Sequence, residues 1–165
     1  MPPLSRIVLA AAVVGSLVVA CGGGTPPHDR ALDILPDLPT GQIGGTPWTM
    51  TKANVKRSTD GGRLDVKLFG DNVADCAFSS PDAGYIIFGM PAAVGKRELQ
   101  LSLSDFESPD NQTITFVTPP SSNDIAVDGI LNVTELTATS VTMGILAKGG
   151  KTTDVNGTFT ATFCQ

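Results

Sequence analysis

The sequence has one histidine and few aromatic residues, and both scarcities exclude chemistry. His28 is the only imidazole in 165 residues, so a metal site built from several histidines is impossible. A catalytic serine-histidine-aspartate triad would have to recruit that single residue. Aromatic residues make up 5% of the chain, with one Trp and one Tyr. We therefore expect a protein that is not an enzyme and that needs no cofactor.

Residues that favour long helices are also scarce. Glycine (18) and proline (12) are abundant, and 13 of the 16 acidic residues are aspartates. Aspartate favours turns and helix caps, whereas glutamate favours helix interiors. A chain of 165 residues is long enough for one domain with a modest core. The composition therefore predicts a single domain made of strands and turns.

Positive charge is low relative to negative charge. Eleven Lys and Arg residues face 16 Asp and Glu residues, which gives a formal net charge of −5 at pH 7. An acidic surface repels the phosphate backbone of DNA and RNA. We therefore expect no nucleic-acid partner.

The chain has one long hydrophobic run, at residues 7–20, and this run is too short for a permanent membrane span. As a helix it would measure roughly 21 Å, whereas the hydrocarbon core of a bilayer is roughly 30 Å thick. Arg6 precedes the run and supplies one positive charge. A basic start followed by a short apolar segment is typical of an export signal. Residues 1–20 are therefore predicted to be a signal peptide.

The end of this run has a specific pattern, Leu17-Val18-Val19-Ala20-Cys21, followed by three glycines. It resembles the signal peptide of bacterial lipoproteins, whose lipobox ends at a cysteine. The resemblance implies that Cys21 carries a diacylglyceryl group and that cleavage occurs between Ala20 and Cys21. The new amino terminus would then be acylated, for example with palmitate. Val18 departs from the leucine that is commonest at its position in that family.

The same resemblance implies where the protein is located. A cysteine with two or three acyl chains anchors a domain to a membrane far better than one chain does. The expected address is the cell envelope, with the membrane as a partner through Cys21. Gly22 stands where lipoproteins kept at the inner membrane often have Asp, so the outer membrane is favoured in a host with two membranes.

Residues 21–45 are predicted to be the lipidated cysteine and a tether. Ten of the 24 residues from 22 to 45 are Gly or Pro, a composition that disfavours packed helices and central strands. A flexible chain of that length spans about 27 Å. Residues 29–35 are an alternative, since they could form two helical turns that dock on the domain. His28 lies in this stretch and is expected to be solvated.

Residues 46–165 alternate apolar and polar side chains in a pattern typical of strands. Seven or eight short strands are predicted, near residues 48–57, 64–68, 84–90, 99–103, 114–118, 125–137, 141–147 and 155–163. A hairpin is expected around Asp60-Gly61-Gly62. This pattern predicts an all-β domain, an antiparallel β-sandwich or alternatively a small β-barrel.

Two cysteines remain once Cys21 is assigned to the lipid. An exported compartment permits disulfides, and two thiols allow one intramolecular pairing. We therefore predict a disulfide between Cys76 and Cys164, which would fasten the last strand.

Candidate binding residues are sparse. Two acidic loops, with Asp71, Asp75 and Asp82 and with Asp105, Glu107 and Asp110, carry oxygen ligands suited to Ca²⁺ but match no calcium-loop motif, so solvated turns are favoured. Asp71 with Asp75 would be the acid pair of an enzyme. Trp48 and Tyr85 could stack on a sugar, although core packing is favoured for Trp48. The leading hypothesis is an interaction or structural module that binds an envelope protein or glycan. The alternative is a carbohydrate- or small-ligand-binding module.

Overall fold

The computed structural model describes residues 27–76, 84–105, 108, 110–120 and 122–164. The predicted signal peptide, the cleavage site at Ala20 and the lipidation site at Cys21 lie outside the described residues, as do Asp82 and Glu107. In the described ranges, no helix is long and apolar enough to cross a bilayer.

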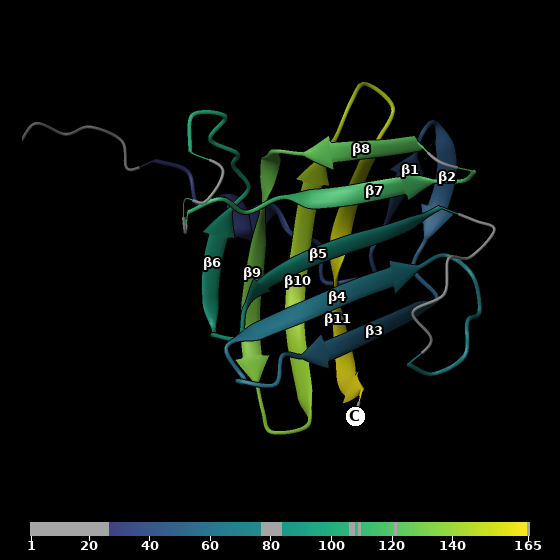
Figure 1. Cartoon of the computed structure of the whole chain (residues 1–165). Coiled ribbons are helices and arrows are strands. Elements are labelled where there is room, and N and C mark those ends of the chain that lie inside the picture. The colour runs from purple at the N-terminus through teal and green to yellow at the C-terminus, as the bar shows by residue number, and fades with distance from the viewer. Residues whose placement is uncertain (1–26, 77–83, 106–107, 109, 121, 165) are drawn as a thin grey trace, which may run out of the picture.

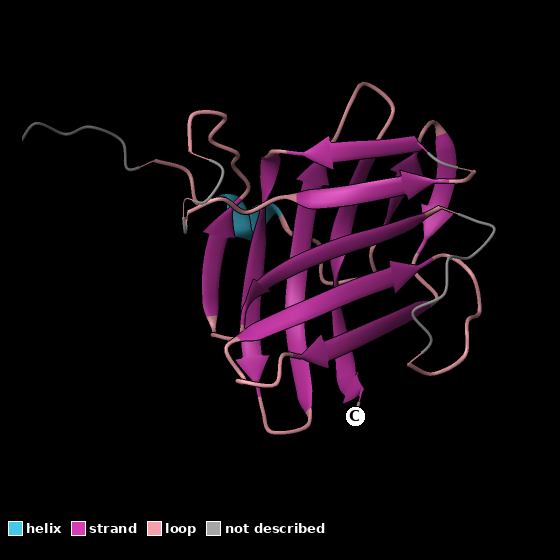
Figure 2. Ribbon diagram, viewed as in Figure 1, coloured by secondary structure: helices cyan, strands magenta, loops and turns pink. Residues whose placement is uncertain are grey.

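The described residues contain eleven strands and one short 3₁₀ helix, joined by turns and loops (Figures 1 and 2). In chain order they are η1 (Arg30–Asp33), β1 (Thr40–Ile43), β2 (Thr46–Thr49), β3 (Lys52–Arg57), β4 (Arg63–Phe69), β5 (Tyr85–Pro91), β6 (Gly95–Glu98), β7 (Ile114–Thr118), β8 (Ser122–Ala126), β9 (Asp128–Leu136), β10 (Ser140–Lys148) and β11 (Asp154–Cys164). The prediction of an all-β domain is confirmed.

The strands form one continuous sheet rather than the two separate sheets expected of a sandwich. Its order is β6-β9-β10-β11-β3-β4-β5-β7-β8, and β1 and β2 pair beside β11. The sheet curls so strongly that it forms a half-barrel, with β3, β4, β5, β7 and β8 crossing in front of β9, β10 and β11 (Figure 1). Because the sheet curls, its two halves lie face to face and bury a core between them without a second sheet.

Strand β11 connects the two halves of the sheet. Along most of its eleven residues it pairs antiparallel with β10, whereas at its end Phe163 and Cys164 pair parallel with Val55 and Lys56 of β3. The prediction of a purely antiparallel sheet is therefore wrong at this one junction. A long strand can join two sheet halves in this way because strand twist turns its end away from its first partner.

The core fills the space between the two halves and follows the predicted alternation. On β4, Leu64, Val66 and Leu68 are buried, so their neighbours on the strand face outward. The same alternation buries residues of the other long strands: Ile86, Phe88 and Met90 on β5, Val141, Met143, Ile145 and Ala147 on β10, and Val155, Phe159 and Ala161 on β11. Period-two patterning therefore identified the inner face of β4, β10 and β11 correctly, whereas the stretch 84–90 was expected to be apolar throughout and its sequence did not indicate which side of β5 faces the core.

Some strand boundaries differ from the prediction. The stretch 125–137 is divided into β8 and β9 at Val127, and 48–57 is divided into β2 and β3. The strand expected at 99–103 is replaced by β6, which ends at Glu98, and Leu103 is exposed. The hairpin between β3 and β4 is confirmed by antiparallel pairing from Lys52↔Phe69 to Arg57↔Leu64.

The turn of this hairpin depends on Asp60. Its carboxylate accepts hydrogen bonds from the Ser58 hydroxyl (2.6 Å) and the Gly62 N–H (2.9 Å). These bonds stabilise the charged form and hold the pKa of Asp60 below its ordinary value of 3.8. Gly61 adopts a φ of +74°, which glycine reaches without steric cost.

The predicted disulfide between Cys76 and Cys164 is confirmed, with a Cα–Cα distance of 5.4 Å. It joins the chain just after β4 to the last residue of β11, beside the two-residue parallel pairing with β3. The bond therefore fastens the end of the chain where the ladder of hydrogen bonds is shortest.

The segment predicted to be a flexible tether is partly folded, so the domain boundary at residue 46 is too late. Strand β1 pairs with β2 through a Gly44-Gly45 turn and also with β11. Residues 29–39, which we call the strap, lie along β9, β10 and β11. Residues 30–33 form a single 3₁₀ turn rather than the two helical turns considered from the sequence. The contacts with β11 come from residues more than 100 positions away, which local composition does not reveal.

Candidate functional site

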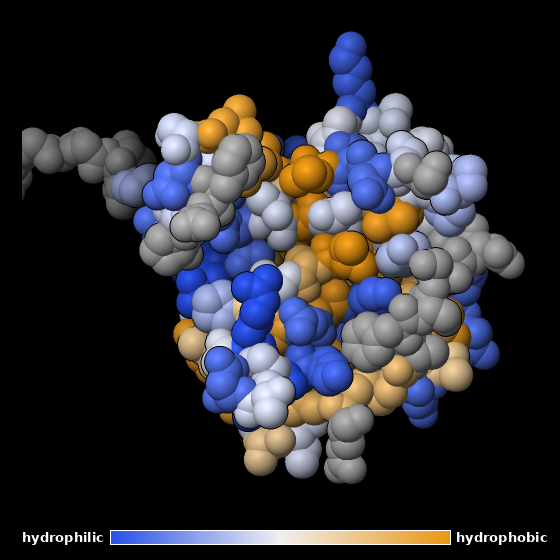
Figure 3. All heavy atoms as spheres, in the orientation of Figure 1, coloured by the Kyte–Doolittle hydropathy of each residue, from blue (hydrophilic) through white to orange (hydrophobic). Residues whose placement is uncertain are grey.

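A groove of about 600 Å³ runs across the outer face of the sheet half formed by β4, β5 and β7. It exists because β7 pairs with β5 only as far as Ile87↔Thr115, so that the rest of β5 faces Ser108 and residues 111–113 instead of a strand. In Figure 3, this face of the molecule shows apolar surface directly beside strongly hydrophilic residues. The groove therefore presents both kinds of contact to a ligand.

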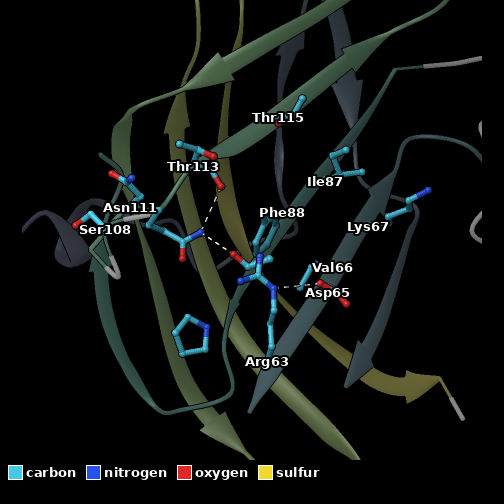
Figure 4. A pocket seen from close by; sticks show the side chains of 13 residues that line it. Arg63, Asp65, Val66, Lys67, Ile87, Phe88, Ser108, Asn111, Thr113 and Thr115 are labelled. Atoms are coloured by element: carbon cyan, nitrogen blue, oxygen red, sulfur yellow. Dashed lines mark hydrogen bonds and ion pairs between the residues drawn. The ribbon is translucent and has the colours of Figure 1, made fainter. Parts of the chain in front are cut away.

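Apart from Val66 and Phe88, which also belong to the core cluster, the groove is lined by residues outside that cluster. Because Leu64, Val66 and Leu68 point into the core, Arg63 and Lys67 point outward from β4. Figure 4 shows the lining residues from close by. They are Arg63, Asp65, Val66, Lys67, Ile87, Phe88, Gly89, Pro91, Ser108, Asn111, Gln112, Thr113 and Thr115.

Gly89 creates room for the guanidinium of Arg63 in the middle of the groove. A Cβ atom at Gly89 would lie 2.0 Å from Arg63 Nη2, so any other residue there would displace this side chain. Arg63 Nε approaches Asp65 Oδ1 only at 3.5 Å, a long ion-pair contact at an exposed site. Together with Lys67, the groove carries two positive charges against the one negative charge of Asp65, in a protein that is acidic overall.

Two amides fix the wall opposite β4. The side chain of Gln112 is buried, and its Nε2 donates to the carbonyl of Gly89 (3.0 Å), where a strand partner would otherwise be. Asn111 accepts a hydrogen bond from the Ser102 N–H (2.7 Å) and donates one to the carbonyl of Asp105 (2.8 Å). Hydrogen bonds within the protein therefore fix this wall of the groove before any ligand binds.

A small aromatic cluster lies on the same outer face. The rings of Phe69 and Tyr85 stack with centroids 6.1 Å apart, and Lys67 Nζ lies 5.5 Å from the Tyr85 ring centroid. A cation near an aromatic face is attracted by the ring quadrupole. This contact helps to orient Lys67 at the side of the groove.

The aromatic residues singled out from the sequence are not a sugar-stacking platform. Trp48 is 6% exposed, and its Nε1 donates to the carbonyl of Gly84 (2.8 Å). Tyr85 is also buried. The expectation that Trp48 packs in the core is therefore confirmed, and stacking of a sugar on Trp48 is excluded by its burial.

The described acidic residues of the two loops do not come together as a metal site. Asp75 forms an ion pair with Lys52, and the backbone carbonyl of Asp71 accepts a hydrogen bond from the Thr51 hydroxyl (2.6 Å). The carbonyl of Asp110 accepts one from Gln100 Nε2 (2.9 Å). Across the residues that the structure describes, no group of three or more His, Cys, Asp or Glu side chains is close enough to hold a metal ion.

The groove itself was missed from the sequence. Arg63 and Lys67 read there only as polar positions of an alternating strand. The available signal was Gly89 inside the apolar strand 84–90, since a glycine within a strand often marks a close approach of another group. Nothing local indicates that Ser108 and residues 111–113 form the opposite wall, because this depends on where β7 leaves β5.

Comparison with protein-family models, with curated proteins and with solved structures finds no match to this chain.

Proposed function

We propose that this chain is an exported, lipid-anchored protein of the cell envelope whose β domain is a non-enzymatic interaction or structural module. The observation that carries the proposal is the Cys76–Cys164 disulfide. Together with Cys21 it accounts for all three cysteines, and disulfides persist in compartments outside the cytosol. The pattern ending in Ala20-Cys21 supplies the expected anchor, and Gly22 favours the outer membrane in a host with two membranes.

Mass spectrometry of the native protein tests the anchor directly. The mature chain is expected to begin at an acylated Cys21, and Cys21→Ser is expected to abolish acylation and the cleavage that follows it. Thr25→Ser is the matched control, since it alters a small polar residue after the lipobox and should leave processing unchanged. If Cys21→Ser were processed and retained in the membrane like the parent, the proposal would be wrong.

The partner is tested by crosslinking in intact cells. If the domain is an interaction module, affinity purification after crosslinking should recover a defined envelope component, and the mature protein should show no turnover of added substrates. Recovery of the chain without any reproducible protein or glycan would contradict an interaction role.

A second function, binding of a carbohydrate or small ligand, is favoured by the groove on β4, β5 and β7. Arg63 and Lys67 suit a carboxylate or phosphate, and the hydroxyls of Thr113 and Thr115 suit the hydroxyls of a sugar. Ile87 supplies apolar contact between these polar walls. The ligand class that this arrangement fits is an acidic saccharide.

Binding of carboxylated oligosaccharides, compared with the same compounds after reduction of the carboxyl groups, tests this second function. Arg63→Gln with Lys67→Gln should reduce binding of the carboxylated compounds at least tenfold. Lys148→Gln, an exposed lysine on β10, is the control and should bind like the parent. Equal binding by both variants would eliminate the groove as the site.

A further inference from the structure

Asn156 and Thr158 on the outer face of β11 hold the strap by hydrogen bonds to the backbone of the strap. The Leu35 N–H donates to Asn156 Oδ1 (2.9 Å), and Asn156 Nδ2 donates to the carbonyl of Asp33 (2.9 Å). The Thr158 hydroxyl donates to the carbonyl of Leu35 (2.9 Å), and the Thr158 N–H donates to the carbonyl of Asp37 (2.7 Å). These bonds fix the path of the strap over the strand.

The start of the strap is held at the β6 edge by ion pairs. Asp29 pairs with Lys96 of β6, and Arg30 pairs with Glu98 (3.3 Å) and with Asp128 (2.6 Å). Each exposed pair contributes little by itself, but together they place residue 29 beside the edge strand. Figure 1 shows the chain leaving the domain on this side, next to η1 and β6.

Ile34 of the strap is partly buried, whereas three of its leucines are exposed. Ile34 lies against Gly144 of β10, where an added Cβ would be 2.7 Å from Ile34 Cγ2. Leu32, Leu35 and Leu38 are 77%, 48% and 55% exposed. Three exposed leucines within seven residues leave apolar surface in water unless another apolar phase covers it.

The length of chain before the strap indicates what covers these leucines. Asp29 lies eight positions after Cys21, which corresponds to about 16 Å on average and to at most about 28 Å when fully extended. A folded domain of this size has a radius of about 18 Å. The side of the domain at which the strap begins therefore stays within contact distance of the membrane, in contrast to the 27 Å span expected for a wholly flexible tether.

We propose that the strap is the lipid-facing surface of the domain and that Leu32, Leu35 and Leu38 lie at the membrane interface beside the acyl chains of Cys21. This inference rests on the proposed lipid anchor. The interface accommodates leucines together with charged neighbours such as Asp33 and Asp37, because the headgroup region is polar. Since the strap covers β9, β10 and β11, the groove on the opposite half of the sheet faces away from the lipid.

Photocrosslinking of the full-length protein in intact cells tests the inference. A photoreactive amino acid is placed at Leu38 or at Ile125, which are matched in exposure at 55% and 52%. Ile125 lies on β8 opposite Thr115, on the groove side of the sheet. After illumination, lipid adducts are expected to be several-fold more abundant at Leu38 than at Ile125.

Release of the strap supplies a second readout. Asn156→Ala with Thr158→Ala removes the three side-chain hydrogen bonds to the strap while leaving the lipobox intact. This variant should still be acylated, and its lipid adducts at Leu38 should decrease because the strap then keeps only the backbone hydrogen bond from Thr158 to Asp37 and the ion pairs at its start. Unchanged adducts would contradict the role of the strap.

The outcomes separate this inference from the anchor on which it rests. Acylation of Cys21 is measured by mass on the same sample. An acylated protein with equal lipid adducts at Leu38 and Ile125, or with adducts at Leu38 to a second copy of the chain, overturns the inference alone. An unacylated Cys21 overturns the proposed anchor and, with it, this inference.

Discussion

Removal of the Cys76–Cys164 disulfide should lower the stability of the domain more than most single changes. The two residues are 88 positions apart, so the bond closes a long loop in the unfolded chain. In the chain-entropy description, a loop of that length corresponds to a stabilisation of about 4.6 kcal/mol at 25 °C, which is a ceiling because disulfides commonly give about 2–4 kcal/mol.

The surrounding structure supports a loss in this range. Only two residue pairs, Phe163↔Val55 and Cys164↔Lys56, join the end of β11 to β3. Without the bond, the end of β11 would be held by this short parallel pairing, by the hydrogen bond from the Phe163 N–H to the carbonyl of Thr139 (2.8 Å) and by the contact of Arg57 with the Phe163 ring. A loss of about 4 kcal/mol is a large fraction of the 5–15 kcal/mol that stabilises a typical domain.

The assay is equilibrium unfolding of Cys76→Ala with Cys164→Ala, followed by circular dichroism and by the fluorescence of Trp48, the single tryptophan. Trp48 is buried and reports on the junction of β2 with the residue before β5. The double variant should melt about 10–15 °C below the oxidised parent, since each kcal/mol shifts the melting temperature of a domain of this size by about 2–4 °C.

Reductant supplies the internal control. It should bring the parent to the melting temperature of the double variant and should leave the double variant unchanged. If the oxidised parent and the double variant melted together, the loop-closure reasoning would be refuted. If reductant shifted the double variant, the effect would have to arise elsewhere.

Three further changes test separate parts of the structure. Gly129→Ala places a Cβ 2.0 Å from a backbone oxygen of β10 at a φ of +140°, so its free energy of unfolding should fall by more than about 3 kcal/mol in a thermal unfolding experiment. Gly95→Ala is the control, since Gly95 has a similar φ of +138° but open space around it. This control should lose only the free energy of backbone strain, about 1–3 kcal/mol. Trp48→Phe leaves the partly buried carbonyl of Gly84 without its donor and should lose about 1–3 kcal/mol in the same assay. Acidification tests the attachment of the strap. The hydrogen bonds from Lys96 and from the backbone N–H of Ala31 lower the pKa of Asp29 below 3.8 in the folded protein. The stabilisation from these bonds is therefore present above pH 3.8 and is lost as the pH falls through the pKa of Asp29 in the folded state. Protection of the strap amides, relative to the exchange of an unstructured peptide at the same pH, should then decrease below pH 3.8 in the parent but not in Asp29→Asn.

Alternation and the number of cysteines were sufficient for several features of the fold. Leu64, Val66 and Leu68 identify a strand with one buried face wherever it lies, because successive side chains of a strand point to opposite sides. Cys76 and Cys164 could be paired without coordinates because Cys21 was already assigned, which left one intramolecular combination.

The candidate site, in contrast, could not be predicted from local patterns in the sequence. The groove needs Arg63 to lie over Gly89, Gln112 to bridge to the Gly89 carbonyl, and β7 to diverge from β5 after Ile87↔Thr115. Each of these contacts joins residues distant in the chain, and none changes the local pattern of apolar and polar residues. The sequence showed where polar side chains lie along each strand but not which of them meet.

The sequence by itself determined that this protein is built from strands with a defined inner face, because side-chain alternation is a local property of the backbone. Only the tertiary structure decided that the sheet is one curled half-barrel and that the strap belongs to it. Asn156 and Thr158 bind backbone atoms more than 120 residues earlier in the chain. A Gly- and Pro-rich segment therefore gains order from partners that its own composition does not reveal.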